Sequence, residues 1–269
     1  MGRNVVLVGC GNMGYAMLKG WLSAGKLATS EITVVEPNEA LRARAAGHGV
    51  TVAPTAEQLE QETADLVIFA VKPQMIRNVV PTYRRFADEA TYVSVAAGMG
   101  IGTFQELLGG DAAIIRCMPN TPAAIGKGMI AVFANPNVRP ETEGFVKDLL
   151  AANGEVATVD DEALIDAVTA VSGSGPAYVF HFIECLTAAA EKTGLPTETA
   201  KLLALQTVYG AAVLAKESGE EPGKLREQVT SPNGTTAAAL AILMGENRLA
   251  KLLGEAVEAA RLRSIELGK

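Results

Sequence analysis

Short hydrophobic runs alternate with helical patterns over the first part of the chain. The runs are continuous, which is typical of strands buried on both faces of a parallel sheet. The predicted strands are Val5–Val8, Ile32–Val35, Leu66–Val71, Tyr92–Val95, Ala113–Arg116 and Met129–Ala134. Residues 13–24 and 39–46 have helical spacing and are each followed by a glycine, a frequent helix terminator. This alternation predicts an α/β fold with a mostly parallel sheet and helices on both faces.

The pattern changes near residue 155. No strand pattern is present from Asp160 onward, and apolar residues instead recur at helical spacing. The predicted helices are Glu162–Val171, Pro176–Thr193, Pro196–Glu217, Pro222–Val229, Thr235–Met244 and Asn247–Leu267. We therefore predict an α/β domain over residues 1–155 and an all-helical domain over residues 156–269. The long helices are apolar on more than one face, and a domain of about a hundred residues has little interior, so we expect two subunits to share them.

Composition and charge narrow the class of protein. Of the 269 residues, 49% are hydrophobic and 20% are charged, which supports a large buried core and argues against disorder. The net charge is −7 and no dense Lys/Arg cluster is present, so we expect no nucleic-acid partner. The apolar run over residues 177–190 is interrupted by His181 and Glu184 and is too short to span a membrane. The first residues lead directly into a strand, so we expect no signal peptide.

The cysteines point to a reducing compartment. Cys10, Cys117 and Cys185 are odd in number and show no paired spacing. Such a sparse set predicts neither a disulfide framework nor a metal site. We therefore expect a cytoplasmic location.

A glycine-rich hexapeptide directly follows the first predicted strand. It reads Gly9-Cys10-Gly11-Asn12-Met13-Gly14 and matches G-x-G-x-x-G between a strand and a helix, as in Rossmann-type dinucleotide-binding domains. Gly9 permits the tight turn, Gly11 lets the backbone approach a diphosphate, and Gly14 allows close packing of helix on strand. The helix N-terminus then offers free N–H groups to the phosphates. A glycine-rich turn without a ligand is the alternative.

Two further segments follow the ends of predicted strands, where open α/β sheets bind ligands. Glu36 closes the second strand, and an acidic residue there accepts hydrogen bonds from the adenosine ribose, which favours NAD over NADP. Asn38, Arg42 and Arg44 lie just beyond it and could meet a 2′-phosphate, so the phosphate state stays open. Ala70-Val71-Lys72-Pro73 ends a later strand, and its lysine could reach a phosphate, the ribose or a substrate carboxylate. A solvated strand-end charge and a surface lysine are the alternatives.

Three polar turns carry further candidates. Arg116–Pro122 ends another predicted strand, and its Asn120 offers a donor and acceptors near the expected position of the nicotinamide. Ser172–Ala177 and Thr230–Thr236 are rich in glycine, proline and hydroxyl residues, and each stands at the start of a predicted helix. Backbone N–H groups at such a start could clamp a small carboxylate, and the four hydroxyls of the second loop exceed what an N-cap needs. Plain turns are the alternative for all three.

No pair of side chains suited to acid–base catalysis is apparent. The histidines are His48, expected in a solvated turn, and His181, expected to be packed within a helix. An enzyme that oxidises an alcohol generally needs a base for the hydroxyl proton. We therefore expect a substrate that requires little proton abstraction, such as an imine.

Together these motifs resemble pyrroline-5-carboxylate reductases over essentially the whole chain. The resemblance rests on the glycine loop and on Ala70–Pro73, Arg116–Pro122, Asp166–Thr169, Ser172–Tyr178 and Val229–Thr236. The last two segments are the most specific, because many dehydrogenases share the glycine loop but not these. The resemblance implies hydride transfer to 1-pyrroline-5-carboxylate, which gives L-proline in the final step of proline biosynthesis. It implies NADPH as the preferred cofactor, with NADH accepted by many members.

The resemblance also implies an assembly and a set of site residues. The helical domain would interleave with its partner in a homodimer, and members often assemble further into a decamer. With the arguments above, the cofactor is expected on Gly9, Cys10, Gly11, Asn12, Met13, Gly14, Glu36, Asn38, Ala70, Val71, Lys72, Pro73 and Asn120. The substrate is expected on Ser174, Gly175, Pro176, Ser231, Gly234, Thr235 and Thr236. Thr236 is the implied catalytic residue, hydrogen-bonded to the ring nitrogen, and Glu36 is the one feature that fits NADPH poorly.

Two other functions compete with this interpretation. A two-domain dehydrogenase of 3-hydroxy acids would use a lysine of the helical domain, for which Lys192 and Lys201 are the candidates. Neither of them lies in a polar motif. A redox-sensing module that binds a dinucleotide and a protein partner would not need the loops Ser172–Ala177 and Ser231–Thr236.

Overall fold

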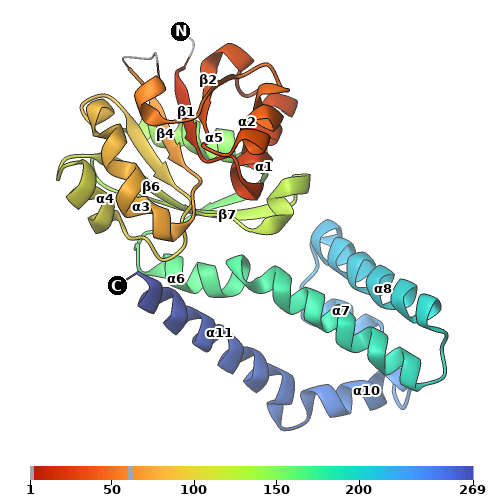
Figure 1. Cartoon of the computed structure of the whole chain (residues 1–269). Helices are drawn as coiled ribbons and strands as arrows, with labels where there is room; N and C mark the ends of the chain where they lie inside the picture. The colour runs from red at the N-terminus through yellow and green to blue at the C-terminus, as the bar shows by residue number, and fades with distance from the viewer. Residues whose placement is uncertain (1–2, 60–62, 269) are drawn as a thin grey trace. The chain divides into compact units, whose positions relative to one another are not determined.

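An eight-stranded sheet forms the centre of the first part of the chain. In the computed structural model, which describes residues 3–59 and 63–268, the strand order is β3-β2-β1-β4-β5-β6-β7-β8. All neighbouring strands are parallel except β6 and β7, which are antiparallel. The strands are β1 (Val5–Val8), β2 (Ile32–Val35), β3 (Thr51–Ala53), β4 (Leu66–Phe69), β5 (Thr91–Ser94), β6 (Ala113–Met118), β7 (Gly128–Ala134) and β8 (Gly154–Thr158). The predicted mostly parallel sheet is confirmed (Figure 1).

The central strands are buried on both faces, which explains their continuous apolar runs. Successive side chains of a strand point to opposite faces. In β1, Leu7 belongs to the core formed with α1 (Asn12–Ser23), α2 (Glu39–Ala46) and α5 (Pro140–Ala151). Val8 belongs to the opposite core, formed with α3 (Ile76–Val79), the 3₁₀ segment Val80–Phe86 and α4 (Ile101–Leu108). The sheet therefore lies as a middle layer between two layers of helices (Figure 1).

The chain reverses its direction of travel across the sheet at β1. It proceeds from β1 outward to β2 and β3, and then returns to β4 on the other side of β1. Hydrogen bonds join the strand ends at this place, from Gly9 N to Val35 O and from Ala70 N to Val8 O, both 2.8 Å long. Ligands of open α/β sheets bind at such a reversal, beyond the carboxyl ends of the strands. The fold thereby brings the glycine loop, Glu36 and Ala70–Pro73 to one edge.

Helices make up the remaining part of the chain. They are α6 (Leu164–Val168), α7 (Gly175–Lys192), α8 (Thr197–Ser218), α9 (Pro222–Gln228), α10 (Thr235–Met244) and α11 (Arg248–Leu267). The chain divides into a sheet unit, Met1–Ser174 with Ala260–Lys269, and a helical unit, Gly175–Ala259. The division falls at Ser174 rather than at residue 155 because β8 completes the sheet and α6 packs on β6 and β7.

The helical unit has almost no interior of its own. Helices α7 and α8 pack along each other (Figure 1). Among residues 175–259, all of which the structure describes, only Ala200 and Ala204 are buried. Large apolar side chains are instead exposed along its helices, namely Val179, Phe180, Phe182, Leu202, Leu203, Leu205, Tyr209, Leu214, Ile242, Leu243, Met244, Leu249, Leu252 and Leu253. Within the described residues, no helix combines the length and hydrophobicity needed to cross a bilayer.

Candidate active site

Two glycines of the glycine loop are required by close packing. Gly9 has φ +89°, in the region that favours glycine. A Cβ on Gly9 would lie 2.8 Å from Val71 Cγ1 and 2.9 Å from the carbonyl oxygen of Ala70. A Cβ on Gly14 would collide with the carbonyl oxygen of Gly9. Glycine at these two positions therefore lets β1 pass directly into α1.

The third glycine faces open space. A Cβ on Gly11 would meet no atom within 4 Å, so packing does not demand glycine there. Gly11 is the N-cap residue of α1 and makes no side-chain cap, so the first N–H groups and the positive end of the helix dipole face outward. A diphosphate needs both the close approach and the donors. The loop therefore fits a dinucleotide.

The three side chains of the glycine loop differ in how deeply they are buried. Cys10 is fully buried, and burial raises the pKa of its thiol to about 11, so the thiol stays protonated at neutral pH. Asn12 is exposed and Met13 is half-buried in the first turn of α1. Cys10 is therefore a packed residue of the hydrophobic core rather than a reactive thiol.

Glu36 is buried at the end of β2 and is fixed by two backbone donors. Only 7% of this residue is exposed. Its Oε2 accepts a hydrogen bond from Cys10 N at 2.7 Å, and its Oε1 accepts one from Asn38 N at 2.9 Å. The carboxylate thus ties the glycine loop to the turn after β2. Asn38 in turn caps α2, because its Oδ1 accepts a hydrogen bond from Leu41 N at 3.0 Å.

The two arginines of α2 are bound to backbone carbonyls. Arg42 Nη1 donates to the carbonyl oxygens of Glu36 and Pro37, both at 2.9 Å. Arg44 Nη2 donates to the carbonyl oxygen of Cys10 at 2.8 Å, and its guanidinium stacks 3.8 Å from the ring centre of Tyr15. Arg42 therefore stabilises the turn after β2, and Arg44 stabilises the glycine loop.

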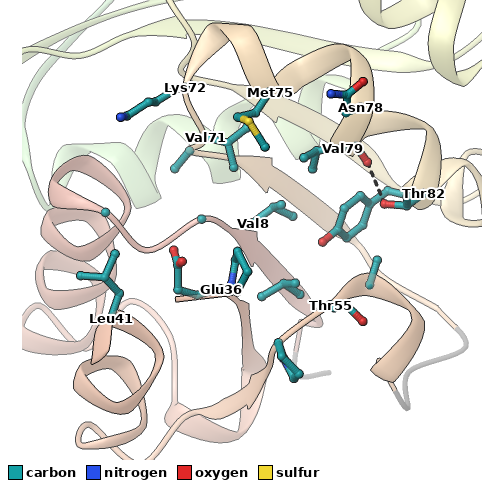
Figure 2. A pocket seen from close by; sticks show the side chains of 18 of the residues that line it. Val8, Glu36, Leu41, Thr55, Val71, Lys72, Met75, Asn78, Val79 and Thr82 are labelled. Carbon is teal, nitrogen blue, oxygen red and sulfur yellow. Dashed lines mark hydrogen bonds between the residues drawn. The ribbon is translucent and has the colours of Figure 1, made fainter. Parts of the chain in front are cut away.

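A pocket of about 420 Å³ opens beside this edge of the sheet. Its walls come from the ends of β1, β2 and β4, from the loop after β3 and from the segment after Pro73. Figure 2 shows Glu36 at one wall, with Leu41 to one side of it and Val71, Met75 and Val79 opposite. A mostly apolar pocket with few polar groups is typical of a site for a flat ring such as adenine.

The segment Ala70–Pro73 forms the rim of this pocket. Ala70, Val71 and Lys72 line it, and Pro73 begins the 3₁₀ turn Pro73–Met75. The Lys72 side chain is exposed (Figure 2). The structure thus brings together the glycine loop, Glu36 and this segment, which the sequence had placed beyond three different strands.

Asn120 joins two of the predicted motifs within the sheet unit. Its Oδ1 accepts a hydrogen bond from Met129 N at 2.9 Å, and its Nδ2 donates to the carbonyl oxygen of Ser172 at 3.0 Å. Residues 169–173 form a single π-helical turn, closed by the bond from Ser174 N to Thr169 O, 2.8 Å long. Such turns occur often at functional sites. The sequence predicted an ordinary helix ending here and gave no sign of the π turn.

A buried arginine network escaped the sequence analysis. Arg116 of β6 is 5% exposed, and its Nη1 lies 3.0 Å from Glu162 Oε1. Its Nη2 lies 3.7 Å from Asp166 Oδ1, which also accepts a hydrogen bond from Ser264 at 2.6 Å. Glu162 Oε1 further accepts the N–H of Ile101 at 2.7 Å, at the start of α4. The network joins β6, α4, α6 and the end of α11.

The loop Ser231–Thr236 lies in the helical unit and ends as an open helix start. Gly234 N donates to the carbonyl oxygen of Ser231 at 3.0 Å, and Asn233 has a positive φ of 59°. Gly234 is the N-cap of α10 and supplies no side-chain cap, so the N–H groups of Thr235 and Thr236 begin the helix. The loop therefore has the geometry of a small anion site. Gly175 and Pro176 likewise begin α7.

The remaining candidates for acid–base chemistry are paired elsewhere. His48 Nε2 lies 3.0 Å from the hydroxyl of Tyr15, and exposed His181 pairs with Glu184 on its own helix. A hydrogen bond from Lys201 to Glu198 raises the pKa of the lysine, whereas a lysine base needs a lowered pKa. Among the described residues, no group of three metal-ligating side chains is gathered.

Comparisons with known proteins agree over nearly the full length. Residues 162–267 match the family model for pyrroline-5-carboxylate reductase dimerisation, and residues 4–98 match that for NADP oxidoreductase, coenzyme F420-dependent. The pyrroline-5-carboxylate reductase of Pseudomonas aeruginosa is 40% identical over 266 residues, which is 98% of this chain and 97% of that protein. The reductase of Arabidopsis thaliana is 39% identical over 267 residues, with coverages of 98% and 95%.

Solved structures give the same result. A pyrroline-5-carboxylate reductase from Coxiella burnetii aligns over 100% of both chains with a TM-score of 0.94 at 34% identity. The Plasmodium falciparum pyrroline carboxylate reductase with NADP bound aligns over 99% of this chain and 98% of its own, with a TM-score of 0.86 at 30% identity.

Proposed function

The chain belongs to the pyrroline-5-carboxylate reductase family, and on that premise we propose that it reduces 1-pyrroline-5-carboxylate to L-proline with a nicotinamide dinucleotide. It is an NAD(P)H-dependent oxidoreductase, and this reaction closes proline biosynthesis. The observation that carries the proposal is the glycine loop and the pocket beside it, at the carboxyl ends of β1, β2 and β4 where the strand order reverses. There, the space beside Gly11 and the start of α1 fit a diphosphate, and the pocket beside Glu36 fits the adenosine.

The dinucleotide supplies the hydride when it is bound. Gly9–Gly14, Glu36, Asn38 and Ala70–Pro73 would hold it, and Asn120 would border the nicotinamide. The resemblance implies NADPH, with NADH accepted as an alternative. Binding of the adenine in the pocket and of the diphosphate at the glycine loop would fix the nicotinamide in place, and such positioning lowers the entropic part of the barrier.

The substrate would be held by the two helix starts singled out in the sequence. The N–H groups of Thr235 and Thr236, with Ser231 and Gly234, would bind the carboxylate, since a helix start favours an anion. The hydroxyl of Thr236 would hydrogen-bond the ring nitrogen and relay the proton that this nitrogen gains. Ser174, Gly175 and Pro176 would line the cleft. An imine needs no base for a hydroxyl proton, in accord with the pairing of both histidines.

We also propose that the helical unit forms a homodimer, with a decamer as the larger assembly. The family model matching residues 162–267 describes dimerisation, and the exposed apolar side chains of α7, α8, α10 and α11 are what a shared core would cover. Cys10, Cys117 and Cys185 are free thiols, which supports a cytoplasmic location.

One assay tests the reaction. The protein is mixed with 1-pyrroline-5-carboxylate, and oxidation of NADPH and of NADH is followed separately by loss of absorbance. We expect oxidation that depends on the substrate and yields L-proline. If neither dinucleotide is oxidised, the proposed reaction is wrong.

A substitution tests the catalytic role of Thr236. Thr236→Val keeps the shape of the side chain but removes the hydroxyl, and we expect turnover to fall by about 100-fold, with dinucleotide affinity unchanged. Thr236→Ser should restore most of the turnover. Thr193→Val is the matched control, because the Thr193 hydroxyl only donates to the carbonyl oxygen of Ala190 at the end of α7. Full turnover in Thr236→Val would remove this residue from the mechanism.

A further inference from the structure

We propose that Glu36 makes the adenosine pocket selective for a ribose with a free 2′-hydroxyl, so that the chain favours NADH over NADPH. The inference rests on the proposed function only in taking the pocket as the site of a nicotinamide dinucleotide. It departs from the NADPH preference that the family resemblance implies.

The first argument is that the Glu36 carboxylate cannot leave its place. Both of its oxygens accept backbone N–H groups, from Cys10 and from Asn38, and the residue is 7% exposed. A rotation away from a phosphate would leave two N–H donors without their acceptor, which is costly in a buried position. The carboxylate is therefore a fixed part of the pocket wall (Figure 2).

The second argument concerns what this fixed group accepts. Each carboxylate oxygen offers about two lone-pair sites and uses one for a backbone donor, so each retains one for a ligand. A ribose hydroxyl carries the proton that such an acceptor needs. A 2′-phosphate is an anion at neutral pH, and beside a carboxylate it would meet a like charge in a partly buried place, where screening is weak.

The third argument is that the groups able to compensate a phosphate are already engaged. Pro37 has no N–H, and the N–H of Asn38 is used by Glu36. Arg42 is drawn back to the carbonyl oxygens of residues 36 and 37, and Arg44 is held on residue 10 and on the ring of Tyr15. An arginine would have to give up these bonds to reach a phosphate.

The fourth argument is the charge of the whole pocket. Among the described residues that line it, Glu36 and Glu57 are acidic and Lys72 is the single basic residue. Lys72 lies on the rim after β4, across the pocket from Glu36 (Figure 2). The wall that would face a 2′-phosphate therefore carries negative charge and no uncommitted cation from α2.

Direct binding measurements test the inference independently of catalysis. The intact protein is titrated by calorimetry with NADH and with NADPH, and in a second pair with AMP and adenosine 2′,5′-bisphosphate, which carry the adenosine end alone. We expect the wild type to bind each ligand without the 2′-phosphate at least about tenfold more tightly. Equal affinity within each pair, or tighter binding of the 2′-phosphorylated ligand, would overturn the inference.

Substitutions assign the effect to Glu36. Glu36→Gln removes the charge but retains an oxygen for one backbone donor, and we expect the NADH-to-NADPH affinity ratio to fall at least about fivefold. Glu39→Gln is the matched control, because it removes one charge from the exposed first turn of α2 outside the pocket. Its ratio should equal that of the wild type. An unchanged ratio in Glu36→Gln would refute the role of this residue.

The outcomes separate this inference from the proposed reaction. If 1-pyrroline-5-carboxylate is not reduced but the binding ratio holds, the reaction is wrong and the specificity of the pocket stands. If reduction proceeds and NADPH binds as tightly as NADH, the reaction stands and the inference fails. Loosening of the glycine loop in Glu36→Gln would weaken the binding of both dinucleotides together, so it cannot by itself produce the expected fall in their ratio.

Discussion

Replacing Arg116 by methionine should destabilise the sheet unit strongly. The guanidinium of Arg116 pairs with Glu162 and Asp166, and the methionine would retain most of the packing of its alkyl part. Both carboxylates would then lack their counter-charge. The side chains of Arg116, Glu162 and Asp166 are 6%, 30% and 17% exposed, so water compensates the loss only in part.

The magnitude follows from this burial. Removing one partner of a buried ion pair typically costs about 3–5 kcal/mol, and the 30% exposure of Glu162 places this case at the lower end, near ~3 kcal/mol. For a unit of this size, each kcal/mol shifts the midpoint of thermal unfolding by roughly 2–4 °C, so we expect a shift of roughly 6–12 °C. Arg77→Met is the control, because its pair with Glu106 is exposed and should contribute less than about 1 kcal/mol.

The single tryptophan provides the assay. Trp21 lies in α1, is fully buried and packs on the sheet, so its fluorescence during urea denaturation reports the sheet unit rather than the helical unit. In the double variant Arg116→Met with Glu162→Gln, one of the two uncompensated charges is gone while an acceptor for Ile101 N is kept. We expect the double variant to be more stable than Arg116→Met alone. A loss below about 1 kcal/mol in Arg116→Met, or simple addition of the two losses, would refute the reasoning.

Two further predictions concern the glycine loop. Gly14→Ala places a Cβ against backbone atoms of Gly9 and should lower the free energy of unfolding of the sheet unit by about 1–3 kcal/mol. The Cβ of Gly11→Ala meets no atom, so this variant should weaken dinucleotide binding at unchanged stability. Equal stability losses of the two variants in urea denaturation would contradict this. Burial raises the pKa of Cys10 from 9.0 to about 11, so the folded chain keeps a proton that the unfolded chain loses, and stability should fall as pH rises from about 9 to about 11. Cys10→Ala should reduce that fall in the Trp21 assay, and an identical fall in the variant would show that the thiol is not its source.

The sheet was predictable where its strands are fully buried. The predicted strands Val5–Val8 and Ile32–Val35 coincide with β1 and β2. All four positions of each strand are buried, so a continuous apolar run marks both ends of the strand. The edge strands β3 and β8 were missed, since β3 has three residues and β8 is mostly exposed or half-buried. Helices α4 and α5 were also missed.

The candidate site was predictable only in its local motifs. The glycine loop can be recognised from six consecutive residues, because the spacing of its glycines fixes its shape. The network of Arg116 joins residues 46 to 98 positions apart, such as Asp166 with Ser264, and the bond from Asn120 to Ser172 spans 52 positions. No local pattern encodes pairings of that range, and they appear only once the sheet and α6 are assembled.

The division of the sheet unit in the sequence has a consequence for folding during synthesis. Residues 3–174 leave the ribosome before residues 260–268, which supply Ser264 beside Asp166 and Leu267 beside Gly98. Domains generally fold as units as they emerge, but this one is completed only by a segment made after the whole helical unit. The nascent sheet therefore exists for a time with Asp166 lacking its serine partner, and a premature stop before Ser264 would leave it permanently in that form.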